Sequence, residues 1–270
     1  MLDKEITAMD WLKLRKENSF VVPKAEQISV CQTEIVLNDD SKLTVVTDEY
    51  NGRTAPLRVL SFDIETLLGP NDSFPATGAT KVIQIANMVS IWPTDTAKPF
   101  IRKIFALKSC NPISGAQVVT FNQEKDLLRA WRDSVLAVDP DIVIGYNILK
   151  FDIPFLAKRA EIFGISNFRC TGRLKNPTLS LGQTADFKGR IVFDLYPHFQ
   201  GNHPSLTSHH LNAVALHFLD DKKEDMSYTD IPVLYAGNSA DRRKLAIYCF
   251  KASSRTFFLF FRRPGFVLRK

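Results

Sequence analysis

The stretch Arg58-Val59-Leu60-Ser61-Phe62-Asp63-Ile64-Glu65 decides how this chain is expected to fold. Its apolar, β-branched content predicts a buried strand over residues 58–64. Because side chains alternate along a strand, the apolar residues share one face while Asp63 and Glu65 share the other. Two carboxylates side by side in a core repel each other, and a hard divalent cation such as Mg²⁺ would remove that repulsion. The alternative is that both acids lie in solvent at the strand end, since Asp-x-Glu alone is a common tripeptide.

Further elements are predicted on the C-terminal side of this strand. Runs of apolar and β-branched residues predict strands at 81–91, 101–107, 117–121, 141–146 and 190–195. Apolar residues spaced by three or four predict helices at 124–138, 151–163, 206–219 and 241–251, with Ser239 as the N-cap of the last. Strands first, then helix, strand, helix, strand and helices, is the order of a ribonuclease-H-like α/β fold, a mixed central sheet flanked by helices.

The chain is expected to divide at two points. Its 270 residues are enough for one domain of ordinary size and a smaller piece. Residues 1–55, with a predicted strand at 32–37, are expected to be the β-rich end of a separate domain. Residues 56–251 form the α/β domain, and residues 252–270 form a basic tail that contains Phe257-Phe258-Leu259-Phe260-Phe261.

Composition excludes several classes of protein. The chain is 45% hydrophobic and 24% charged, as expected of a soluble globular protein, and it has no apolar run near the ~20 residues of a membrane span. Its charged N-terminus has no apolar core, so we expect no secretory signal. The four cysteines lie far apart without a Cys-x-x-Cys pair, which argues against a zinc or iron–sulfur site and favours a reducing compartment.

The net charge of +6 comes entirely from the last twenty residues. They hold six basic residues and no acidic ones, so removing them from 35 basic and 29 acidic residues leaves 29 of each. Because the rest of the chain is neutral, overall charge is no argument that it binds nucleic acid. Any contact with DNA must depend on a local site.

Two further short blocks carry polar side chains at expected element ends. Asp152 lies where a strand gives way to a helix, a position at which capping of the helix is the simpler interpretation. Asn147 would then be an ordinary turn residue. On the last helix, Tyr248 and Ala252 are neighbours on one face, where a tyrosine could orient water; the alternative is that Tyr248 only packs in the core.

Taken together, these blocks resemble the proofreading region of the family B DNA polymerases. The stretch from Ala55 to Glu65 is similar to the first exonuclease motif. Gly145-Tyr146-Asn147-Ile148 with Phe151-Asp152-Ile153-Pro154-Phe155-Leu156 resembles the second, and Tyr248-Cys249-Phe250-Lys251 begins the third. Shorter similar blocks lie at 82–87, 107–110, 126–133, 138–142, 211–214, 217–219 and 223–225, with an echo at 31–35. The resemblance covers residues 55 to 251, and residues 1–55 would be the end of the polymerase N-terminal domain.

The resemblance implies a two-metal 3′→5′ exonuclease that removes single nucleotides from DNA. Asp63, Glu65 and Asp152 would hold two Mg²⁺ or Mn²⁺ ions, and Tyr248 would position the attacking water. Asn147 and Phe151 would contact the single-stranded or frayed 3′ end of the DNA. The family also implies replication in the nucleus and contacts with accessory subunits and a sliding clamp, whose binding regions are expected mostly outside this chain; no membrane partner is implied.

The chain departs from the family in two respects. The third motif should continue Lys-Asp-Ala, but Ala252-Ser253-Ser254 follows Lys251, so the acid that completes the first metal site is missing. Losing one ligand is expected to weaken metal binding and rate by roughly 10²-fold or more. In addition no polymerase domain follows, so we expect a truncated catalytic subunit with an impaired exonuclease. Asp194 and Asp241 are not expected to replace the missing acid.

Two other functions stay open, and so does the nature of the tail. The chain could be a catalytically inert module that binds single-stranded DNA, or a non-functional gene fragment. Residues 252–270 could contact DNA or a membrane surface through their basic and aromatic residues. We favour instead a translated intron or shifted reading frame, because the resemblance stops inside a helix. An exposed Phe-rich stretch would then favour aggregation.

Overall fold

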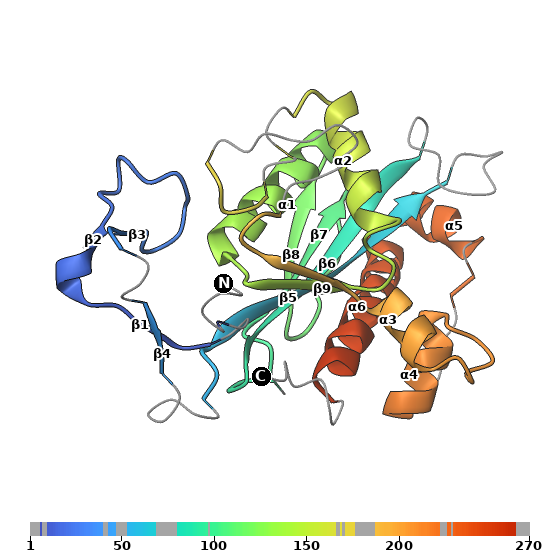
Figure 1. The fold of residues 1–270 in the computed structure, drawn as a ribbon. Helices are drawn as coiled ribbons and strands as arrows, with labels where there is room; N and C mark the ends of the chain where they lie inside the picture. Colours follow the sequence, from blue (N-terminus) through green and yellow to red (C-terminus); the bar gives the residue numbers. More distant parts are fainter. Residues whose placement is uncertain are drawn as a thin grey trace.

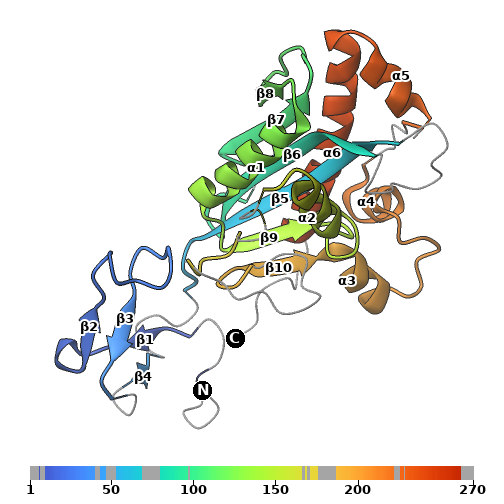
Figure 2. The same ribbon diagram turned by 90° about the horizontal axis from the view of Figure 1, so that it is seen from above.

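The computed structural model describes residues 6, 10–39, 43–46, 53–68, 80–96, 98–165, 168, 171–175, 187–221, 226–227 and 229–262. Its centre is a six-stranded sheet in the order β10-β9-β5-β6-β7-β8, whose strands can be followed in the second view (Figures 1 and 2). The strands are β5 (Leu57–Leu67), β6 (Lys81–Trp92), β7 (Ile101–Leu107), β8 (Gln117–Phe121), β9 (Ile142–Gly145) and β10 (Ile191–Asp194). β6 pairs antiparallel with β5 and β7, and the other pairs are parallel. The predicted mixed sheet is confirmed, and the ribonuclease-H-like assignment stays a prediction.

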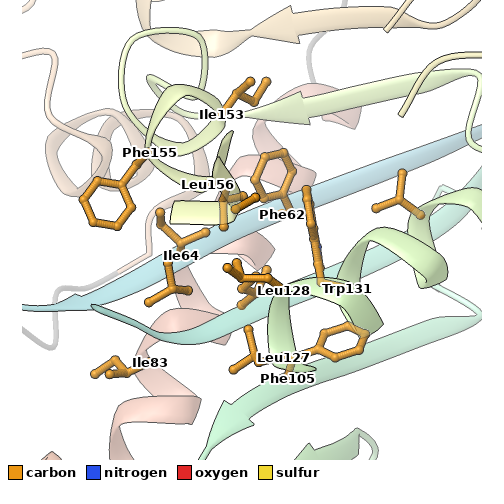
Figure 3. Close-up of a cluster of buried hydrophobic side chains, with 14 of the residues drawn as sticks. Phe62, Ile64, Ile83, Phe105, Leu127, Leu128, Trp131, Ile153, Phe155 and Leu156 are labelled. Atoms are coloured by element: carbon orange, nitrogen blue, oxygen red, sulfur yellow. The ribbon is translucent and has the colours of Figure 1, made fainter. Parts of the chain in front are cut away.

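Helices cover both faces of this sheet, as the two views show (Figures 1 and 2). They are α1 (Glu124–Val138), α2 (Asp152–Ile162), α3 (Leu195–Asn202), α4 (Leu211–Leu219), α5 (Asp230–Ala236) and α6 (Ser239–Phe261). α1 and α2 pack on one face, where Phe62 and Ile64 of β5 meet Leu127, Leu128 and Trp131 of α1 (Figure 3). α6 packs on the opposite face, against the alternate residues of β5 and β6. No helix within the described residues is long and apolar enough to cross a membrane.

The described residues in 10–39 and 43–46 include two small antiparallel strand pairs beside the main sheet (Figure 1). β1 (Leu12–Lys13) pairs with β4 (Thr44–Val45), and β2 (Ser19–Val21) pairs with β3 (Ile35–Leu37), after a short 3-10 turn at Lys16–Asn18. The predicted strand at 32–37 is thus reduced to β3. Backbone hydrogen bonds from Val30 N to Arg173 O, 2.7 Å, and from Lys175 N to Ile28 O, 2.9 Å, join this region to the main body.

The largest correction to the sequence predictions concerns residues 252–261. They continue α6 without interruption, and Phe257, Leu259 and Phe260 are buried, so the expected exposed Phe-rich stretch is wrong for this part of the chain. The cause is the spacing of buried side chains along the helix, at 246, 249, 250, 253, 257 and 260, which keeps one face of α6 on the sheet. Residues 263–270 lie outside the described residues, as does the block at 223–225.

Smaller differences concern helix ends and short helices. Asn238, not Ser239, caps α6, and its side chain accepts hydrogen bonds from Ala240 N at 2.8 Å and Asp241 N at 3.1 Å. The predicted helix at 206–219 begins only at Leu211. α3 and α5 were not predicted, because each is short and contains a proline, which obscures the apolar period.

Candidate active site

Asp63 and Glu65 lie on the face of β5 that is turned toward α6. Ser61, on the same face, exchanges hydrogen bonds with Ser253 of α6, 2.9 and 3.1 Å, which confirms the predicted alternation. Asp63 is half-buried and Glu65 is 8% exposed. Because Glu65 is buried, the alternative that both acids lie in solvent is wrong. Among the described residues no hydrogen bond or ion pair reaches the Glu65 carboxylate.

Asp152 approaches the same strand from α2. It is the first residue of that helix, whereas Phe151 holds the N-cap position, so the simpler capping interpretation is also wrong. The Asp152 side chain is 3% exposed, and its Oδ1 accepts a hydrogen bond from the backbone N of Ile64 at 3.2 Å. The strand residue between Asp63 and Glu65 therefore fastens the third carboxylate beside the other two.

The three carboxylates raise one another's pKa values. Burial, and then the charge of Glu65, raises the pKa of Asp63 well above its usual range. Burial and Asp152 raise the pKa of Glu65 to about 8, while burial and Asp63 raise the pKa of Asp152. A buried acidic cluster without a cationic partner destabilises its ionised form, and a divalent cation is the group that would stabilise it.

The potential ligands are only partly those of the prediction. Ligand atoms of Asp63, Glu65 and Cys249 lie within 4.8 Å of one another, whereas Asp152 is not part of that group. The Cys249 thiol donates a hydrogen bond to the Asp63 carbonyl oxygen at 3.5 Å. Burial and the charge of Asp63 raise the pKa of this thiol, so it is protonated beside the acids. Among the described residues, no cationic side chain forms a hydrogen bond with the Asp63 or Glu65 carboxylate. Carboxylate oxygens are the ligands that hard divalent ions prefer, so these two side chains could bind such an ion.

A cavity of about 460 Å³ opens beside the acids. It is lined by residues of β5, of the β9–α2 turn, of α3, α4 and α6: Asp63, Ile64, Glu65, Tyr146, Asn147, Tyr196, His210, Leu211, Asn212, Tyr248, Ala252 and Arg255. Of the predicted site residues, Asp63, Glu65, Asn147 and Tyr248 all line this cavity. Phe151 does not line the cavity; its ring packs against Phe155, with ring centroids 5.7 Å apart.

Asn147 is held in place by Asp194, a residue that the sequence reasoning considered only as a substitute metal ligand. Asn147 has a left-handed backbone, φ 65°, and its N–H donates to Asp194 Oδ1 at 2.7 Å. The same carboxylate accepts from Leu149 N at 3.1 Å and Tyr196 N at 3.0 Å. Asp194 therefore fixes the turn and caps α3. Asp194 ends a strand directly before a helix, a position where an acid often caps the helix. That position in the sequence could have indicated its role.

The α6 side of the cavity has no carboxylate. Tyr248, Ala252 and Arg255 follow one another at helical spacing and all line the cavity. Burial and the charge of Glu65 raise the pKa of the Tyr248 hydroxyl, so it is a hydrogen-bond donor at neutral pH. Asp241 lies near the start of α6, where it pairs with Lys244 at 3.0 Å, outside this cavity. Neither Asp194 nor Asp241 replaces the acid missing at Ala252, as expected.

Comparisons with known proteins identify the family of this chain. Residues 1–214 match the family described as DNA polymerase family B, exonuclease domain. The chain is 38% identical over 265 residues to the DNA polymerase delta catalytic subunit of Oryza sativa subsp. japonica, and 40% identical over 265 residues to that of Dictyostelium discoideum. Identity to the Arabidopsis thaliana subunit is 39% over 266 residues. Each match covers 93% of this chain, and 23% of the first two relatives and 24% of the third.

The chain thus spans less than a quarter of the length of these relatives. Within family B, the sequence blocks were most similar to the polymerase delta catalytic subunit, and the names of the relatives confirm that prediction. The matched range includes the strand with Asp63 and Glu65 and the turn with Asn147 and Asp152. This chain belongs to the exonuclease-domain family of the family B DNA polymerases.

Proposed function

We propose that this chain carries the 3′→5′ proofreading exonuclease region of a DNA polymerase delta catalytic subunit, with a weakened active site. The observation that carries the proposal is the convergence of three carboxylates from β5 and α2, with Glu65 and Asp152 buried and Asp63 half-buried, beside a cavity lined by Asn147 and Tyr248. On this proposal residues 1–55 end the polymerase N-terminal domain. Residues 56–251 are the ribonuclease-H-like exonuclease domain, and its last helix continues to Phe261.

Each residue has a distinct part in the proposed reaction. Asp63, Glu65 and Asp152 would hold two Mg²⁺ or Mn²⁺ ions once they are ionised. Bound divalent ions supply an activated water and stabilise the charge that develops at phosphorus. Tyr248 would donate a hydrogen bond that positions the attacking water, and Asn147, on its rigid turn, would bind the 3′-terminal nucleotide. Phe151, half-buried at the start of α2, would contact the frayed end.

The weakened site follows from Ala252. Its methyl group lines the cavity one helical turn after Tyr248, where the family supplies an acid. With one fewer carboxylate, divalent ions bind less tightly, and we expect cleavage slower by roughly 10²-fold or more. The same observation favours a second function, an inert module that binds single-stranded DNA without cutting it. Nuclear location and contacts with replication subunits follow from the proposed identity.

The test is a nuclease assay on 3′-labelled single-stranded DNA with Mg²⁺ and with Mn²⁺. It compares the unmodified chain with Ala252→Asp and Asp63→Ala. We expect slow cleavage by the unmodified chain, cleavage faster by about 10²-fold for Ala252→Asp, and none for Asp63→Ala. If neither the unmodified chain nor Ala252→Asp cuts DNA, the exonuclease function is wrong. Binding without cleavage would then support the inert module.

A further inference from the structure

Arg255 is the one guanidinium group among the described residues that line the cavity. It lies three residues after Ala252 on the same face of α6, and it is 5% exposed. It belongs to the segment in which the chain departs from the family, so the resemblance assigns it no role. The placement is unusual because a cation here faces the same space as the buried carboxylates of β5.

Two neighbours hold the Arg255 side chain still. Its Nε donates to Asp221 Oδ2 at 2.7 Å, and its Nη1 donates to Asn212 Oδ1 at 2.7 Å. A guanidinium has five N–H donors, and these two contacts use two of them. Neither involves Nη2, which makes no hydrogen bond to a described residue. Because the side chain is already ordered, little rotamer entropy is lost when an anion binds the remaining donors.

The charge of Arg255 acts on the reacting groups. Burial, Glu65 and Asp63 raise the pKa of the Tyr248 hydroxyl, and Arg255 offsets part of that rise, so the cation and the acids act on the same phenol in opposite directions. A DNA strand that approaches the acids brings negative phosphates toward negative carboxylates. A fixed guanidinium at the cavity wall supplies the opposite charge and a planar pair of donors, the geometry that matches phosphate oxygens.

We propose that Arg255 binds a backbone phosphate of the single-stranded DNA that enters this cavity. The ligand class is a phosphodiester, and the contact lies on the α6 side, where Ala252 offers no metal ligand. This inference deepens the proposed function, since the strand is the substrate of the same site. It does not depend on cleavage, because the contact needs neither a divalent ion nor the acid missing at position 252.

The test measures binding of a short fluorescein-labelled oligothymidylate to the full chain by anisotropy, in EDTA and over a range of salt concentrations. We expect Arg255→Gln to weaken binding by about 10-fold near 0.1 M salt. The slope of log Kd against log salt should fall by about 0.7, the value for one lost phosphate contact on a single strand. Arg255→Lys keeps the charge without the planar donors, so its affinity for the oligonucleotide should lie between those of the unmodified chain and Arg255→Gln.

Two matched variants separate this role from general charge and from a purely structural one. Arg243 also lies on α6, but it donates to the Pro112 carbonyl at 2.9 Å and does not line the cavity. Arg243→Gln should therefore leave affinity and slope unchanged. Asp221→Ala removes one anchor yet keeps the Arg255 charge, so it should leave the salt slope unchanged, whatever the loss of side-chain order does to affinity. If Arg255 only ties α6 to Asp221, Arg255→Gln and Asp221→Ala would lower the melting temperature alike, and neither would change the salt slope.

The outcomes are distinct from those of the nuclease assay. A chain that binds DNA through Arg255 in EDTA but never cleaves would support this inference and contradict the exonuclease. An equal loss of affinity in Arg243→Gln, or no DNA binding by the unmodified chain, would overturn the inference whatever the nuclease result. An unchanged salt slope in a folded Arg255→Gln protein would overturn it too.

Discussion

β5 and α6 meet at two places that differ in almost every physical respect. At the first, Ser61 and Ser253 exchange hydrogen bonds, and Phe257 nearby is completely buried. At the second, about one turn of helix away, Asp63 and Glu65 face α6 with no cationic partner in the described part of the chain, and their pKa values are raised. The first place satisfies its polar groups and stabilises the fold, whereas the second keeps charges in a costly state that a bound cation would relieve. The contact between β5 and α6 thus contains both a stabilising hydrogen-bonded pair and the proposed metal-binding acids.

The largest loss of stability is expected from Phe257→Ala, which removes apolar packing next to the Ser61–Ser253 contact. Phe257 is 0% exposed and lies in the cluster between α6 and the sheet. Removing its ring should cost about 3–5 kcal/mol of unfolding free energy through lost burial and a residual cavity. Urea unfolding measures this, with the half-buried neighbour Phe258→Ala as the milder control. If Phe257→Ala unfolds at the same urea concentration as the unmodified chain, residues 252–261 do not pack as described.

An intermediate change in stability is expected from Glu65→Gln, which removes one ionisable carboxylate from the acidic cluster. The pKa of Glu65 is raised to about 8, so the folded state holds a proton that the unfolded chain releases near pH 4.5. That stability is fully present below the unfolded pKa and is lost as the pH rises through about 8. Without divalent ions, Glu65→Gln should therefore raise the melting temperature at pH 8.5 by on the order of 5 °C, and hardly at pH 4.

The comparison for this prediction is Glu161→Gln, an exposed glutamate on α2. It should shift the melting temperature little at either pH, because surface pairs contribute little. Added Mg²⁺ should stabilise the unmodified chain at pH 8.5 and leave Glu65→Gln nearly unchanged, since the ion binds the ionised carboxylate. A Glu65→Gln effect of equal size at both pH values would show that proton binding is not its cause.

The smallest effect is expected from Ser253→Ala. It removes the hydrogen bond from Ser253 Oγ to the Ser61 carbonyl oxygen, 3.1 Å, while the helix and the sheet stay in place. One buried hydrogen bond is worth about 1 kcal/mol. Urea titrations should resolve that loss from the half-buried neighbour, Ser254→Ala, which we expect within about 0.5 kcal/mol of the unmodified chain. A Ser253→Ala loss above about 3 kcal/mol would mean that this contact has a larger role than the hydrogen bond explains.

Local pattern was enough for most of the sheet and the first helices. The predicted bounds of α1, β7 and β8 agree with the structure, because each is a strongly periodic or β-branched run bounded by polar residues or proline. The two acids of β5 were placed on one face by alternation alone. In contrast, no local pattern indicated that the ring of Phe151, which the resemblance places at the end of the DNA, packs against Phe155 and the core beside α2.

The amino-acid pattern alone was enough to predict the sheet strands and the longer helices, the face of β5 that carries Asp63 and Glu65, and the missing acid at Ala252. These depend on spacing within a few residues. The folded chain was needed to show that Asp194 fixes Asn147, that Arg255 lines the cavity, and that residues 252–261 are part of the core. Those facts depend on contacts between residues far apart in the chain, such as Ser61 and Ser253, which are 192 positions apart. No local pattern specifies which distant surface a side chain will meet, because packing of whole elements makes that choice.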